Sequence, residues 1–202
     1  MRFHLPLNDV LGSKIKLNLL RVLSRTRSDH TGRELARLIG YSHNATRSAL
    51  EDLERSGLVI QRQAGRANLY SIDQDNIIYT DILISAFRIE DELMDRVAET
   101  VAKQSGKELS SLILFGSVAR SDEDPGSDID MVLVFKDGTD LQEKEDSVHD
   151  AAVEIVRRFG NQLSPIIVTE SEFEKKKRSK TGQWREIAQT GVLIKPNKGL
   201  SP

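Results

Sequence analysis

The stretch LFGSVARSDEDPGSDIDMVLVF, residues 114–135, places two apolar runs on either side of an acidic loop. The first run leads into a Gly-Ser pair, and the second opens with Asp128-x-Asp130 after a Pro-Gly sequence (125–126) that suits a type II turn. Because side chains alternate along a strand, the two aspartates are predicted to share one face. Two carboxylates on one face repel each other, and a divalent cation would relieve that repulsion. The alternative is that one aspartate caps the turn and the other is solvated at the strand end.

The Gly-Ser pair follows a predicted strand at 109–115. Gly116 lets the backbone approach a ligand closely, and Ser117 with the amides after it can bind phosphate oxygens where a helix opens. Arg120 lies one turn further along that helix and would add a cation to the same pocket. Mg²⁺ selects hard oxygen ligands and typically binds one or two carboxylates together with substrate phosphates. The stretch therefore predicts a pocket for phosphates and a metal ion.

The composition limits what kind of protein carries this pocket. With 202 residues and 38% hydrophobic content, the chain is long enough for one large domain or two small ones. It has no cysteine, which excludes disulfides and thiolate metal sites, and its four histidines form no zinc pattern. The N-terminus lacks the apolar core of a signal peptide, and no apolar run approaches the roughly 20 residues of a membrane span. We therefore expect a cytoplasmic protein with no membrane partner.

Charge is distributed unevenly along the chain, although the net charge is only −2. Residues 1–80 carry 12 Lys+Arg against 8 Asp+Glu, so the first part is basic and the remainder is acidic. A basic part can face a polyanion. An imbalance of this size is also common on ordinary solvated surfaces, so charge alone favours nucleic acid only weakly.

The first part of the chain predicts a helix-turn-helix. Apolar residues at helical spacing indicate a first helix at 13–24. Thr31 with Glu34 three residues later has the pattern of a capping box for a second helix, and Ser42 is the predicted N-cap of a third. A glycine follows each of the last two helices, as a stop signal. A helix, a tight turn and a second helix of this kind make a helix-turn-helix.

After the third helix the apolar period changes from 3.6 to 2, which predicts a hairpin with strands at 58–63 and 68–72. The phrase LEDLERSGLVIQRQAGRANLYSI (50–72) resembles the recognition helix and wing of winged-helix transcription regulators, and the resemblance covers about residues 10–75. It implies double-stranded DNA as a partner. Its contacts would be made in the major groove by the third helix and at phosphates or the minor groove by the wing. The residues concerned are His43, Asn44, Arg47 and Ser48 on the helix and Arg62 and Arg66 on the wing. The alternative is a protein-interaction module.

A long amphipathic helix is predicted between the two parts, at about 76–105, where apolar residues recur at helical steps. The apolar positions are Ile78, Ile82, Ile89, Leu93, Val97 and Val101. This stripe would close the back of the winged helix, pair with a second copy to form a homodimer, or cover the next domain's sheet. The predicted domains are thus 1–75, the connecting helix, 106–195, and a mobile tail at 196–202.

Gly116-Ser117, ten intervening residues and Asp128-x-Asp130 before an apolar strand resemble the signature of the DNA polymerase beta-like nucleotidyltransferases, especially the minimal nucleotidyltransferases. The resemblance extends over about 109–195. It implies that the Gly-Ser pair binds the phosphates of an NTP and that the aspartates are catalytic ligands of Mg²⁺ or Mn²⁺. The implied reaction transfers a nucleoside monophosphate to an acceptor, with pyrophosphate leaving. The expected fold class is α/β in two domains, a winged helix followed by a mixed sheet with helices.

The sequence departs from this family at the third carboxylate, which completes the metal site and helps to activate the attacking hydroxyl. Ser164 occupies the expected position, within Gln-Leu-Ser-Pro-Ile (162–166). A neutral hydroxyl is a weak Mg²⁺ ligand and a poor proton acceptor, so catalysis is expected to be reduced or lost. Three hypotheses stay open: a DNA-tethered transferase, a nucleotide-sensing transcription regulator without turnover, and an antitoxin-type transferase that modifies a partner protein.

Overall fold

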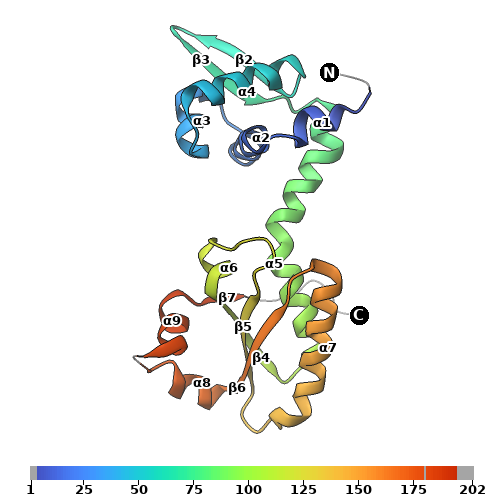
Figure 1. Cartoon of the computed structure of the whole chain (residues 1–202), viewed down its shortest axis with the longest axis vertical. Coiled ribbons are helices and arrows are strands. Elements are labelled where there is room, and N and C mark those ends of the chain that lie inside the picture. Colours follow the sequence, from blue (N-terminus) through green and yellow to red (C-terminus); the bar gives the residue numbers. More distant parts are fainter. Residues whose placement is uncertain (1–3, 180, 195–202) are drawn as a thin grey trace. The chain divides into compact units, whose positions relative to one another are not determined.

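The computed structural model describes residues 4–179 and 181–194, and the predicted tail at 196–202 lies outside them. The chain divides into two compact units, residues 1–91 and 92–202 (Figure 1). Each unit has its own hydrophobic core. In the part of the chain that the structure describes, we find no helix with the length and hydropathy that a membrane span requires.

The first unit is a three-helix core with a β-hairpin, the arrangement of a winged helix-turn-helix (Figure 1). Its elements are α1 (Pro6–Leu11), α2 (Lys14–Thr26), β1 (His30–Thr31), α3 (Gly32–Ile39), α4 (His43–Arg55), β2 (Val59–Ala64) and β3 (Ala67–Ile72). The strands are antiparallel in the order β1-β3-β2. Leu20, Leu35 and Leu50, one from each of α2, α3 and α4, are fully buried together. The predicted helix-turn-helix and wing are therefore confirmed.

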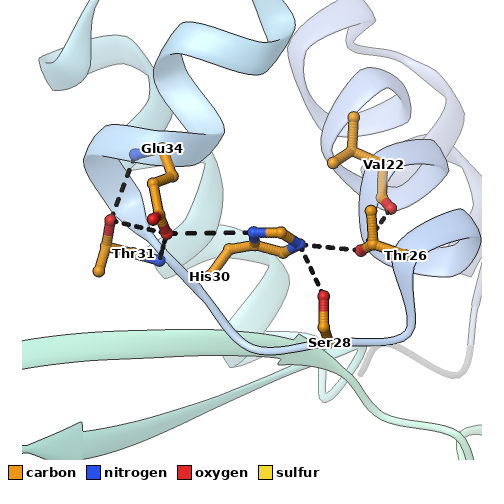
Figure 2. Close-up of polar contacts among 6 residues, drawn as sticks. All are labelled: Val22, Thr26, Ser28, His30, Thr31 and Glu34. Atoms are coloured by element: carbon orange, nitrogen blue, oxygen red, sulfur yellow. Dashed lines mark hydrogen bonds and ion pairs between the residues drawn. The ribbon is translucent and has the colours of Figure 1, made fainter.

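Local hydrogen bonds fix where α3 and α4 begin. The Glu34 amide donates to Thr31 Oγ1 at 3.3 Å, and the Thr31 amide donates to Glu34 Oε2 at 2.8 Å, so the predicted capping box is formed (Figure 2). The predicted cap of α4 is also present, because the Ala45 amide donates to Ser42 Oγ at 3.3 Å. These caps satisfy amides that a helix start leaves unpaired.

His30 joins the end of α2 to the start of α3 (Figure 2). Its Nε2 lies 2.9 Å from Thr26 Oγ1 and 3.0 Å from Ser28 Oγ. Its Nδ1 faces the capping-box carboxylate, 4.0 Å from Glu34 Oε2. The His30 ring therefore contacts polar groups on both α2 and α3, the helices on either side of the segment that carries it.

Replacing Thr31 with alanine is expected to destabilise the start of α3 by about 1 kcal/mol, because the Glu34 amide loses its acceptor. Hydrogen exchange of the α3 amides should then be roughly fivefold faster than in the wild type. Thr31→Ser keeps the hydroxyl and should restore protection. Equal exchange in the alanine and serine variants would show that the cap contributes nothing.

The predicted connecting helix is present as one π-helical turn, Tyr79–Leu83, followed by α5 (Ile84–Ser105). Its apolar stripe is divided. Ile78 is buried in the core of the first unit, and Val97 is buried in the core of the second. Between them Ile89 is 41% exposed and Leu93 is 42% exposed. Pairing of this exposed segment with a second copy stays a prediction.

The second unit is a mixed four-stranded sheet covered by helices (Figure 1). Besides the end of α5, its elements are β4 (Leu109–Phe115), α6 (Gly116–Arg120), β5 (Ile129–Phe135), α7 (Leu141–Phe159), β6 (Leu163–Thr169), α8 (Glu170–Lys176), α9 (Gly182–Thr190) and β7 (Val192–Ile194). The strand order is β6-β5-β4-β7; β5 and β6 are parallel, and the other pairs are antiparallel. The expected mixed α/β class is confirmed.

The two faces of this sheet bury separate clusters of side chains. On one face Met131 and Leu133 of β5 pack with Val148 and Ile155 of α7. On the other, Val132 of β5 packs in a cluster with residues of α8 and α9. Alternation along β5 therefore directs the side chain of residue 130 to the α8–α9 face.

Candidate functional site

Asp130 lies at the start of β5 and is partly buried, whereas Asp128 lies just before the strand and is exposed. Burial raises the pKa of the Asp130 carboxyl above its usual range, a hydrogen bond from the Ser164 hydroxyl opposes this, and the neighbouring charge of Asp128 adds to it. The turn before the strand has the predicted form, because the Ser127 amide donates to the Asp124 carbonyl at 2.9 Å and Gly126 has φ +90°. Asp128 thus lies close enough for its charge to disfavour the ionised form of Asp130.

Gly116 lies directly against Asp130. Antiparallel pairing places Phe115, the last residue of β4, opposite Asp130, and Gly116 follows with φ +74°. A Cβ atom at position 116 would clash with Asp130 Oδ2. Glycine is therefore required here by the carboxylate beside it as well as by the backbone conformation. Ser117 follows in the first turn of α6.

Ser164 is the residue of β6 that pairs in register with Asp130 across the parallel strands. Its hydroxyl lowers the pKa of the Asp130 carboxyl and so partly offsets the effect of burial. The position next to Asp130 on the neighbouring strand is therefore neutral.

Arg120, at the end of α6, is held by two carboxylates. Its Nε donates to Asp122 Oδ2 at 3.1 Å, and its Nη1 donates to Glu186 Oε1 of α9. These acids, Asp122 first, raise the pKa of the guanidinium, while the charge of Glu186 also contributes to the raised pKa of Asp130. Sequence reasoning did not find Glu186, because it lies 66 residues from Arg120 and belongs to no motif.

The site offers a metal ion two carboxylates. Among the residues described, no three His, Asp or Glu side chains are grouped closely enough to hold a metal ion by themselves. The pair fits Mg²⁺ because this ion commonly combines one or two carboxylates with phosphate oxygens of its substrate. Asp128 and Asp130 would hold such an ion together with a triphosphate.

A basic groove opens between the helix-turn-helix and the wing. It encloses about 520 Å³ and is lined by His43 and Arg47 of α4, Arg66 of the wing, and Arg33 of α3, among others. Arg47 also pairs with Glu51 at 2.9 Å. Arg33 was missed by sequence reasoning, because the fold alone brings the first turn of α3 beside the wing.

The other predicted DNA contacts lie outside this groove. Asn44 and Ser48 are exposed on α4. Arg62 lines a separate hollow of about 480 Å³ that also contains Asp29 and Asp73. Its guanidinium lies 3.9 Å from Asp29 Oδ1, so its charge is partly balanced within the protein.

Comparison with known proteins finds a family match within the second unit. The family model described as "Nucleotidyltransferase domain" matches residues 94–188. A curated relative from Methanocaldococcus jannaschii, named "Putative protein adenylyltransferase", is 30% identical over 77 residues, which are 38% of this chain and 52% of the relative. The chain therefore spans about half the length of that relative.

Solved structures resemble parts of the chain. The homodimeric winged helix-turn-helix DNA-binding domain of a Mycobacterium bovis protein is 21% identical and has a TM-score of 0.36, covering 43% of this chain and 77% of that one. A structure from Sulfolobus solfataricus, described as a "putative nucleotidyltransferase", is 24% identical and also has a TM-score of 0.36, covering 58% of this chain and 88% of that one. Residues 94–188 therefore match the nucleotidyltransferase domain family, and the unit before them has the arrangement of a winged helix-turn-helix.

Proposed function

We propose that the chain is a DNA-binding protein whose nucleotidyltransferase domain binds an NTP with Mg²⁺ and transfers the nucleoside monophosphate to an acceptor hydroxyl. The observation that carries this proposal is the contact between Gly116 and Asp130, which sets a Gly-Ser loop directly beside an Asp-x-Asp pair. A phosphate held at the loop would lie next to a cation held by the aspartates.

In this reaction a bond forms between the acceptor oxygen and the α-phosphorus of the NTP. The bond from that phosphorus to the oxygen that bridges it to the β-phosphorus breaks, and pyrophosphate leaves. Bound Mg²⁺ supplies charge stabilisation for the phosphates. Asp128 and Asp130 orient the ion, and Ser117 binds phosphate oxygens. The hydroxyl proton passes to water, because Ser164 is too weak a base to accept it.

We further propose ATP as the nucleotide and a protein hydroxyl as the acceptor. The support is the name of the Methanocaldococcus jannaschii relative, a protein adenylyltransferase, whose matched segment covers part of this chain. Incubation of the purified chain with α-labelled ATP, Mg²⁺ and cell extract should transfer the label to a protein band. Transfer of label to RNA alone would contradict the protein acceptor. Absence of any labelled acceptor with each of the four NTPs would contradict the assignment as well.

A second function, nucleotide sensing without turnover, is favoured by one observation. Ser164 stands in register with Asp130, where a third carboxylate would complete the catalytic set. Two aspartates and a Gly-Ser loop are enough to bind a nucleotide with its metal. Binding of Mg²⁺ and ATP without any transfer, together with a change in DNA affinity on binding, would identify the sensor.

For the first unit we propose that the groove between α4 and the wing contacts the DNA backbone. Replacing Arg47 and Arg66 together with alanine should weaken DNA binding. Log K falls as log salt rises, and this negative slope should become shallower by about 2, because each arginine neutralises about one phosphate. Fluorescence anisotropy at several salt concentrations measures both quantities.

Arg55→Ala is the matched control for this pair. Arg55 is an exposed arginine at the end of α4, outside the groove, and is paired with Asp52. Its removal should leave the salt slope nearly unchanged. If Arg55→Ala reduced binding as much as the groove variants, the attraction would be diffuse and the groove would not be the binding surface.

A further inference from the structure

Arg120 is the cation that α6 presents beside the aspartates, and two acids already hold it. Asp122 binds its Nε from the loop that follows, and Glu186 binds its Nη1 from α9. The guanidinium charge is therefore shared between protein carboxylates before any ligand arrives. A triphosphate that binds Arg120 has to share its charge with these acids or displace one of them.

Glu186 is fixed in place by the helix that carries it. Ile187, the next residue, is buried in the core beneath α9, and Trp184 packs against the same cluster. The Thr190 hydroxyl donates to the backbone carbonyl of Glu186 at 3.0 Å, one turn further along α9. Helices α6 and α9 pack against each other, so Glu186 meets Arg120 at a defined place.

We infer that Glu186 is a positioning residue that competes with the nucleotide's phosphates for Arg120 and so lowers the affinity of the site for nucleotide. The inference rests on the proposed function. Two effects of Glu186 act in the same direction: its carboxylate occupies Arg120, and its charge adds to that of the acidic residues around Asp130. Both side chains are about 40% exposed, so each effect is reduced by solvent.

The test is the binding of ATP with Mg²⁺ to the full-length chain, measured by calorimetry. Glu186→Gln keeps the shape of the side chain and removes its charge, and it should tighten binding by roughly two- to fivefold, the range of an exposed ion pair. Arg120→Ala should weaken binding. Adding Glu186→Gln to Arg120→Ala should tighten binding clearly less than it does in the wild type, because only the effect of its charge remains when Arg120 is absent.

Glu145→Gln is the matched control. Glu145 is exposed on α7, outside the site, and its replacement removes one negative charge from the same unit. It should leave affinity unchanged. If Glu145→Gln tightened binding as Glu186→Gln does, or if Glu186→Gln acted equally without Arg120, the effect would be general electrostatics and the inference would be wrong.

Unchanged or weaker binding in Glu186→Gln would also overturn the inference. That outcome differs from failure of the proposed function. If the wild type binds ATP only when both Asp128 and Asp130 are present, the proposed nucleotide site stands and only the role of Glu186 is rejected. If neither wild type nor Glu186→Gln binds ATP, both are rejected.

Discussion

Replacing Asp128 and Asp130 together with asparagine should abolish Mg²⁺-dependent ATP binding, with a loss in affinity of at least about 10³-fold. The two carboxylates are the only acidic ligands that the site is proposed to give the metal ion, and amide oxygens carry no charge to replace them. Calorimetry with and without Mg²⁺ measures this loss. The wild type should bind ATP much more weakly once Mg²⁺ is removed, whereas the double variant should be insensitive to the ion.

The double variant should remain folded. The pKa of Asp130 is raised by burial and by the charge of Asp128, so its ionised form is unfavourable in the folded chain. Asparagine removes the charges, and its carbonyl can still accept the Ser164 hydrogen bond. Thermal unfolding should therefore occur at the same temperature as in the wild type or higher. Undiminished ATP binding in this variant would rule out the metal site.

Replacing Ser164 with aspartate should raise the rate of nucleotide transfer by about 10²-fold, the lower end of what general acid–base groups contribute. Ser164 pairs in register with Asp130, so a carboxylate at this position would point to the same region and accept the proton of the attacking hydroxyl. Transfer of label from α-labelled ATP, measured as an initial rate, reads out the gain.

Ser164→Asn separates this chemistry from packing, because asparagine matches aspartate in size but is neither charged nor basic at neutral pH. It should produce no gain. The transfer rate of the aspartate variant should also depend more steeply on Mg²⁺, since the carboxylates at positions 128, 130 and 164 then lie close together and repel one another without the ion. If the aspartate variant transfers no faster than the wild type while binding ATP equally well, the missing carboxylate is not what limits the reaction.

Most of the fold could be predicted because its signals are local. The strand bounds at 109–115 agree with the structure, and so do the capping residues Thr31 and Ser42. An apolar run follows Ser164 in the sequence and marks the strand that carries it, β6. In each case neighbours within a few residues determine the local conformation, and the sequence displays those neighbours directly.

What could not be predicted depends on contacts between distant segments. Glu186 meets Arg120 only because α9 packs on α6, and no spacing rule connects the two residues. Arg33 reaches the groove only because β1 pairs with β3 beside the wing. The stripe of the connecting helix was predicted as one face, but it serves two cores, so Ile89 and Leu93 are left exposed between them.

Gly116 carries a consequence for how related chains are compared. Two features favour glycine at this position: its φ is positive, and the Asp130 carboxylate occupies the space that a side chain would need. Any substitution at position 116 would strain the backbone, and its Cβ would force the Asp130 carboxylate to move. We expect residue 116 to differ from glycine only in related sequences that also lack the aspartate at position 130. Loss of this glycine would then indicate that a related chain has lost the metal site.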